Sequence, residues 1–393
     1  MKTWLLQHKE PTTSTPSTSR LVLLDAVKIL AMIMMMQGHT LDGLVRPTEL
    51  DIYNLPWSIW HLMRGFTAPV FLTVSGMLFA ITLKRNDQGQ ISKLLAWKRV
   101  RWALILMVIG YLMVFPANNI IHLFWVNADG WKMFFQTNIL QLNAVTLALV
   151  TLTAYKTYSN KTLGIVSFAI AMFITLVTPF VNMSVNWFNF LPEGIAAFLS
   201  YAHGSIFPIF PFSSYMFFGV AAGTVLQRVP KEERFSYLKR NSWKVGLALV
   251  SIGGALAYGL PFIPLYPPHD FLLSSPATVF LRTAFVFFMI SAVAVIYPIF
   301  RKQENTVALF GKQSLIIYVV HLVLLFGTPW FPSIGRIYFK SLTLEAGILW
   351  AVAVVAATLA FVIIEDYIKN NAVRVARIIR ISSAVLLAYA LLL

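Results

Sequence analysis

Long apolar stretches separated by short polar connections run through most of the chain. Because about 20 apolar residues in a helix cross a hydrocarbon core roughly 30 Å thick, we predict ten membrane spans. They lie at about 21–45, 59–83, 102–116 running on towards 124, 133–154, 162–181, 208–227, 245–265, 277–300, 307–327 and 344–364. Strands of a membrane barrel would instead show about 10 strictly alternating residues. The pattern therefore predicts an all-α, polytopic helical bundle, with one integral domain over residues 21–364.

The two ends of the chain differ from this bundle. Residues 1–20 are rich in Thr, Ser and Pro, which is typical of a disordered tail, and they lack the features of a cleaved signal peptide. Residues 365–380 carry four basic side chains and are predicted to lie on the membrane surface as an amphipathic helix. The last apolar piece, 381–393, is short for a span, so eleven spans are the alternative to ten.

The composition agrees with a membrane protein. Hydrophobic residues make up 58% of the 393 positions, charged residues only 12%, and the mean hydropathy is +0.72. Soluble domains carry roughly 25% charged residues, so an ordinary soluble enzyme and a disordered chain are both excluded. The absence of cysteine excludes disulfides and thiolate chemistry.

The net charge of +16 indicates how the chain is oriented in the membrane. If the N-terminus is cytoplasmic, 24 of the 31 Lys and Arg residues fall in cytoplasmic segments and four in outer loops. Such an asymmetry is the positive-inside signal. This asymmetry explains the basic composition. We therefore expect the lipid bilayer as a partner of the chain, and we do not expect nucleic acid. Three cations remain inside predicted spans: Lys28, Arg64 and Arg282.

The first span carries a stripe of ionisable residues. Asp25 and Lys28 are three residues apart and share one helix face, so they can pair. His39 follows after eleven more residues, which is close to three full turns, on nearly the same face and about 16 Å further out. Ionisable groups inside spans are functional candidates by default. The alternative is an anchor in which Lys28 and His39 merely reach the two membrane interfaces.

Other polar side chains also fall on the spans. His61 and Arg64 lie at the mouth of the second span, Asn138 and Gln141 in the fourth, and Arg282 in the eighth. In the ninth span one face carries Ser314, Tyr318 and His321. Any one of these sets is explained by hydrogen bonds between helices. Together they predict a polar cavity threading the bundle. Six of the seven histidines are predicted in its outer half or outer loops: His39, His61, His122, His203, His269 and His321.

Motifs of other enzyme classes are missing. The chain has no nucleotide-binding glycine loop, no zinc-protease motif and no serine nucleophile elbow. Its histidines have no metal-ligand spacing, so no metal is expected. The small-residue pair Gly219 and Gly223 predicts close packing of helices rather than a site.

Two segments resemble the membrane acyltransferase superfamily. LDAVKILAMIMMMQGH (24–39) is similar to its opening helix, L-D-x-L-R-G-L-A, in which ten residues separate the arginine from a histidine, as they separate Lys28 from His39. HLMRGFTAPVFLTVSGMLFA (61–80) resembles its next helix, with an F-x-x-x-S-G core and a T-x-P-x-F element. The shorter pieces 138–145 and 314–325 agree with acyltransferase family 3, and with the bacterial branch related to heparan-α-glucosaminide N-acetyltransferase. Two departures stand out, Lys28 in place of the arginine and Ile29 in place of the following glycine.

The resemblance implies transfer of an acyl group, usually acetyl from acetyl-CoA at the cytoplasmic side, to a hydroxyl or amine of an extracytoplasmic glycan or sugar. It implies a bacterial inner-membrane protein whose donor substrate is an acyl-CoA, with no bound cofactor. His39 corresponds to the catalytic histidine, acting as a base or as an acyl carrier. The predicted donor-binding residues are Lys28, Asp25, Arg64 and Arg282. The predicted cavity residues are His61, Asn138, Gln141, Tyr318 and His321. Monomer and homodimer stay open.

Two other functions are compatible with the same residues. A transporter or exporter of a glycan, lipid or small anion would use the polar stripe as a permeation path, although it should show internal repeats or paired helix breaks. A non-catalytic scaffold of an envelope assembly would tolerate lysine at position 28, where arginine's planar contact with phosphate is lost.

Overall fold

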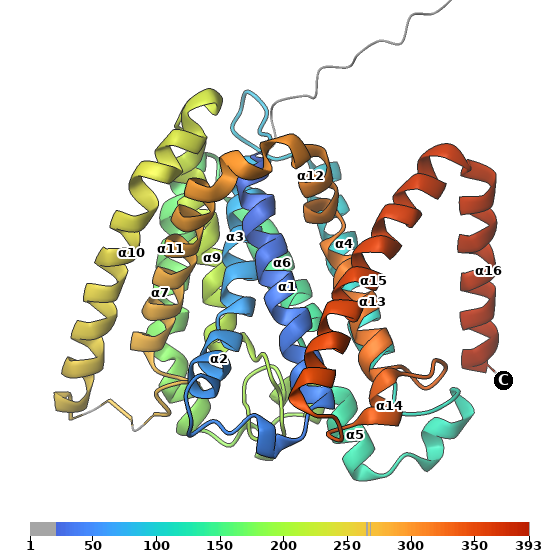
Figure 1. Ribbon diagram of the computed structural model, residues 1–393. Helices are drawn as coiled ribbons and strands as arrows, with labels where there is room; N and C mark the ends of the chain where they lie inside the picture. The colour runs from blue at the N-terminus through green and yellow to red at the C-terminus, as the bar shows by residue number, and fades with distance from the viewer. Residues whose placement is uncertain (1–20, 265, 268, 393) are drawn as a thin grey trace, which may run out of the picture.

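The structure is a computed structural model that describes residues 21–392 apart from 265 and 268, and it is helical throughout. No strand occurs in this part of the chain. The helices stand side by side as one bundle (Figure 1). The predicted all-α polytopic fold is confirmed.

Eleven helices cross the bundle in the described residues. Nine segments are long and apolar enough to span a membrane, and α4 and the 13-residue α13 run beside them. The crossing helices are α1 (Val22–Leu44), α3 (Thr67–Ile81), α4 (Lys93–Met113), α6 (Ile139–Lys156), α7 (Asn160–Met183), α9 (Ile209–Gln227), α10 (Arg234–Gly259), α11 (Pro276–Phe300), α13 (Ser314–Phe326), α15 (Leu344–Asn371) and α16 (Val373–Leu392). Short helices join them: α2 (Trp57–Arg64), α5 (Ala128–Phe135), α8 (Glu193–Ala196), α12 (Glu304–Lys312) and α14 (Ile334–Tyr338).

The C-terminal segment differs from its prediction. Helix α15 continues to Asn371, and α16 then turns back at the basic end as one 20-residue helix that diverges from α15 (Figure 1). The three arginines at 374, 377 and 380 therefore occupy the first half of a long apolar helix, and no separate surface helix forms over 365–380. Arginines near a span end can extend their charged heads to the interface, so they do not stop the helix. Eleven crossing helices match the alternative rather than the ten first counted.

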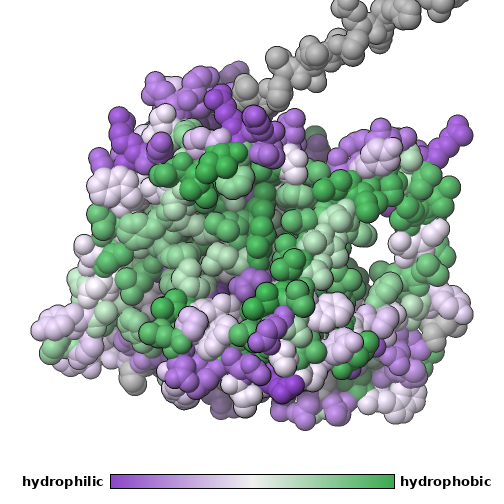
Figure 2. Space-filling view, in the orientation of Figure 1, coloured by the Kyte–Doolittle hydropathy of each residue, from purple (hydrophilic) through white to green (hydrophobic). Residues whose placement is uncertain are grey.

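The two ends of the bundle differ in character. One end holds α12, the connections 84–92 and 228–233 and the junction of α15 with α16, and we call it the basic end (Figure 1). The opposite end holds α2, α5 and α14, and we call it the histidine end. Figure 2 shows hydrophilic residues at both ends and a hydrophobic belt between them. This distribution is what a membrane-spanning bundle requires.

Helix α1 lies inside the bundle and organises it. It packs against α3, α11, α12, α13 and α15. Its apolar side chains belong to several separate core clusters, with Leu24 and Val27 in one and Met32 and Met36 in another. Because α1 is surrounded by helices, its ionisable residues are directed into protein and not into lipid.

The crossing of α3 and α9 depends on glycine. A Cβ atom added to Gly219 would lie 2.0 Å from the Thr73 carbonyl oxygen, and one added to Gly76 would lie 2.1 Å from that of Met216. The two backbones therefore touch, which only glycine permits. The predicted packing role of Gly219 and Gly223 is confirmed, because a Cβ on Gly223 would also lie 2.6 Å from the Met77 carbonyl oxygen.

This contact predicts a selective loss of stability. Gly219→Ala should lower the free energy of unfolding by about 1–3 kcal/mol, because the methyl group forces α3 and α9 apart. Gly254→Ala is the matched control, since a Cβ there meets nothing within 4 Å. Thermal unfolding in detergent measures both variants. Equal melting temperatures for the two would contradict the backbone contact.

Candidate functional site

Two histidines from distant parts of the chain meet between α1 and α13. His39 Nδ1 lies 3.2 Å from His321 Nε2, and the two rings stack with centroids 5.4 Å apart. His321 is fully buried, whereas His39 is partly accessible. The sequence predicted both residues in one cavity but gave no reason to pair them. The fold brings them into direct hydrogen-bond contact.

The hydrogen bonds of this pair fix the position of each proton. His321 Nδ1 lies 2.8 Å from the Ile317 carbonyl oxygen, which can only accept, so Nδ1 carries the proton. In neutral His321, Nε2 is then an acceptor, and the proton between the rings belongs to His39 Nδ1. The lone pair of a neutral His39 is consequently on Nε2. That atom is free to take a proton or to act as a nucleophile.

An ion pair lies beside the histidine pair. Arg64 Nη1 donates to Asp42 Oδ1 at 3.0 Å, and the guanidinium lies 4.9 Å from the centre of the Trp60 ring. Asp42 follows His39 by about one turn of α1, so both charges of the pair act on the imidazole. The site thus combines a neutral base with a positive group oriented by a carboxylate.

A cavity opens next to this pair at the histidine end. Its volume is about 310 Å³, and its lining includes Asp42, Trp60, His61 and Lys340. His61, predicted as a cavity residue, is exposed on this surface. A space of this size bordered by an indole, a carboxylate and a cation can hold one small polar molecule.

Arg282 also belongs to the histidine end. Its Nη2 lies 3.3 Å from where a Cβ of Gly65 would stand, immediately after Arg64, and its charge acts on Tyr215. The structure therefore divides the four predicted donor-binding residues. Asp25 and Lys28 lie towards the basic end, whereas Arg64 and Arg282 lie with His39. Helix α11 runs in the direction opposite to α1, as the alternation of the predicted spans requires, so a residue near its start lies at the histidine end.

Asp25 and Lys28 form the second polar cluster. Lys28 Nζ donates to Ser314 Oγ at 3.2 Å and lies 5.0 Å from the centre of the Phe71 ring. Asp25 is fully buried against α12, where a Cβ on Gly311 would lie 2.3 Å from its Oδ1 atom. The two contacts of α1 with α13, through Lys28 and through His39, are about 16 Å apart along α1.

Arg99 on α4 was not singled out from the sequence. Its guanidinium lies 3.7 Å from the centre of the Phe79 ring, and its Nη1 atom is buried without a hydrogen-bond partner. Phe79 is eight residues beyond Phe71 on α3 and therefore about 12 Å nearer the basic end. Arg99, which lies over Phe79, is accordingly nearer that end than Lys28, which lies over Phe71. Arg99 is one of six basic residues over 84–101, and the sequence did not distinguish it from the others, because only the fold buries its Nη1 atom.

Two predicted cavity residues have a structural role. The Asn138 side chain accepts from the backbone N–H groups of Leu140 and Gln141, and Gln141 Oε1 accepts from the Asn138 N–H. This capping box begins α6 and accounts for the side-chain oxygen atoms of both residues, whereas Gln141 Nε2 is buried without a hydrogen-bond partner. An Asn followed three residues later by Gln before an apolar run is a signal that the sequence contained. Tyr318, by contrast, lies beside His321, with ring centroids 5.6 Å apart.

Comparison with known families identifies the class of protein. A model described as an acyltransferase domain matches residues 21–364. The chain belongs to acyltransferase family 3. The match includes every helix that contributes to the site, and it decides for an acyltransferase against a transporter. No curated protein matches the chain.

The proton positions of this acyltransferase can be measured directly. In protein labelled with ¹⁵N-histidine, we expect His321 and His39 both to carry their proton on Nδ1. The Ile317 carbonyl oxygen fixes the proton of His321, and the His321 Nε2 acceptor then fixes that of His39. Spectra of the His39→Gln and His321→Gln variants assign the signals. A proton on His39 Nε2 in the neutral protein would contradict the arrangement.

Proposed function

We propose that this membrane acyltransferase moves an acyl group, acetyl in the simplest case, from acyl-CoA to a hydroxyl or amine of an extracytoplasmic glycan or sugar. The observation that carries the proposal is the His39–His321 pair, which leaves Nε2 of His39 as the basic atom. Asp42, one turn of α1 beyond His39, lines the cavity at the histidine end. Acyl transfer from a thioester requires such a base, because a neutral hydroxyl is a weak nucleophile.

His39 acts first as a base and then as an acid in this proposal. Its Nε2 removes the proton of the acceptor hydroxyl or amine as that atom attacks the thioester carbonyl. The carbon–sulfur bond then breaks, and the proton passes to the leaving sulfur, so CoA departs as a thiol. The imidazolium formed meanwhile donates through Nδ1 to His321, which spreads its charge.

The tetrahedral intermediate carries a negative oxygen that needs stabilisation. Arg64 is the candidate, since its guanidinium lies beside His39 and is oriented by Asp42. Tyr318 is a second candidate because its ring lies next to His321. Cationic and hydroxyl donors that are already oriented stabilise an oxyanion without reorganising.

The donor would enter at the basic end. The phosphates of CoA need cations. Lys84, exposed in the connection 84–92, the unpartnered Arg99 Nη1 and then Lys28 supply them, each further into the bundle than the one before. Lysine is a point charge rather than a planar fork, so Lys28 suits one oxygen or the thioester end better than a bidentate phosphate. The positive-inside rule makes this end cytoplasmic, and we propose a bacterial inner membrane as the location.

The proposal predicts loss of transfer when His39 is removed. His39→Ala in proteoliposomes, supplied with radiolabelled acetyl-CoA and envelope glycans, should lower transfer by a factor of about 10²–10⁴. His122→Ala is the control, since that histidine is exposed in an outer connection. His321→Gln should retain more activity than His321→Leu, because an amide oxygen can still accept from His39 Nδ1. Undiminished transfer by His39→Ala would exclude the catalytic role.

A separate prediction concerns the donor. Arg99→Gln should raise the KM for acetyl-CoA about tenfold with little change in kcat, because the lost contact holds the donor in ground and transition states alike. Lys98→Gln is the matched control, as that neighbour on α4 is exposed. Steady-state kinetics with saturating acceptor separate the two constants. Equal KM values for both variants would remove Arg99 from the donor site.

A further inference from the structure

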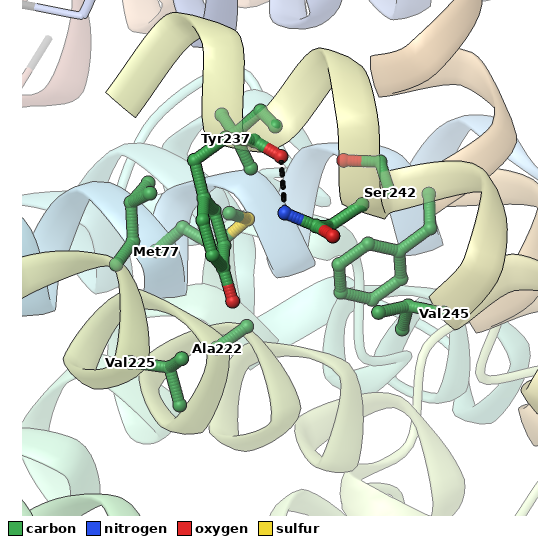
Figure 3. Close-up of a pocket in the computed structure, with 10 residues that line it drawn as sticks. Met77, Ala222, Val225, Tyr237, Ser242 and Val245 are labelled. Carbon is green, nitrogen blue, oxygen red and sulfur yellow. Dashed lines mark hydrogen bonds between the residues drawn. The ribbon is translucent and has the colours of Figure 1, made fainter. Parts of the chain in front are cut away.

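A second cavity lies on the far side of the bundle, away from the histidine pair. It measures about 230 Å³ and is enclosed by side chains from α3, α9, α10 and α11 (Figure 3). Met77, Val225, Val245 and Phe287 make most of its wall apolar. It is therefore suited to a hydrocarbon chain and not to a hydrated ion.

The cavity opens sideways between α9 and α10. Helix α10 packs along α11, and no comparably close packing joins it to α9. Val225 on α9 is 46% exposed and Val245 on α10 is 39% exposed. In a membrane such an opening faces lipid, so a lipid chain can enter it without passing through water.

A buried hydroxyl inside this apolar cavity has no partner. Ser242 is 2% exposed, its Oγ atom makes no hydrogen bond, and it lines the cavity together with Tyr237 and Asn241 (Figure 3). Serine in a helix can donate to the carbonyl four residues back, yet this one does not. An unpartnered hydroxyl in apolar surroundings is costly. It fits an occupant that brings an acceptor, such as an ester carbonyl, to this depth.

The turn above the cavity is basic. Arg234 lies one turn before Tyr237 and Leu238 on the same face of α10, and it donates to the carbonyl oxygens of Val229 and Gln227. Arg228 and Lys231 are exposed on the same turn. Glu232 and Glu233 accompany them there, but the segment 228–244 has six basic residues against these two acids. A negative headgroup is therefore favoured at the mouth of the cavity.

We propose that this cavity binds an anionic phospholipid from the leaflet at the basic end. Its phosphate contacts the turn between α9 and α10, an ester carbonyl accepts from Ser242, and one acyl chain lies along Met77 and Phe287. The phosphate, the ester and the acyl chain of the lipid then lie in the same order as the basic turn, Ser242 and the apolar residues that follow it along α10. The bound chain fills the space between α9 and α10, where the protein itself leaves a gap.

The lipid is distinct from the acyl donor. At about 100° per residue, Met77 faces the cavity some 160° around α3 from Phe79 and about 120° from Phe71. Those two phenylalanines contact the cations proposed for the donor. The cavity is therefore on the other side of α3, and the inference does not rest on the proposed function.

Native mass spectrometry tests the proposal on the full chain. The probes are phosphatidylglycerol and phosphatidylcholine with identical acyl chains, mixed equally in vesicles before extraction. We expect wild type to retain phosphatidylglycerol at least fivefold over phosphatidylcholine. Arg228→Gln with Lys231→Gln should abolish this preference. The matched control is Arg374→Gln with Arg377→Gln, which removes the same charge from α16 at the same end and should leave the preference intact.

A third variant tests the cavity itself. Ala222→Phe should fill the space and lower retention of both lipids, whereas Val352→Phe on the exposed face of α15 should not. Equal retention of the two lipids by wild type, or an equal loss in the α16 control, would overturn the proposal. Displacement of the lipid by acetyl-CoA, or dimerisation in place of lipid retention, would also overturn it. Because the first double variant changes only exposed side chains, it folds even if Ala222→Phe does not.

Discussion

The contact between α1 and α13 is the interaction on which the rest of the site depends. A membrane helix cannot expose Asp25, Lys28 and His39 to hydrocarbon, so α1 must be surrounded by other helices. Helix α13 meets it twice, through Ser314 at Lys28 and through His321 at His39. One requirement, that buried polar groups find partners, thus sets both the central position of α1 and the pairing that gives His39 its free Nε2.

The two contacts divide the interior by chemistry. At the basic end, the cations of Lys28 and Arg99 lie over the rings of Phe71 and Phe79 on α3, in an environment suited to phosphate. At the histidine end, a neutral imidazole pair stands beside the oriented ion pair of Arg64 and Asp42. About 16 Å of helix separates them, and this is the distance over which a donor and an acceptor from opposite sides must be brought together.

Packing is uneven around this interior. Glycines bring the backbones of α3 and α9 into contact, so the scaffold next to α1 is rigid. On the outer side of α9 the packing is loose, and α10 leaves a cavity with an unpartnered serine. Close packing of α3 on α9 keeps the reacting groups aligned. The cavity between α9 and α10 is the space that the proposed lipid fills. The proposed donor site and the proposed lipid site therefore lie on different faces of α3.

The sequence alone determined the membrane class, the orientation of charge and the stripe on α1, because apolar length and helical periodicity are local properties. It also contained the packing role of Gly219 and the unrecognised cap at Asn138. Only the tertiary structure decided that His321 pairs with His39 and that the Nη1 atom of Arg99 is buried. Those facts depend on which helices adjoin and in which direction each runs. Periodicity assigns a residue to a helix face, but it does not say which helix that face meets.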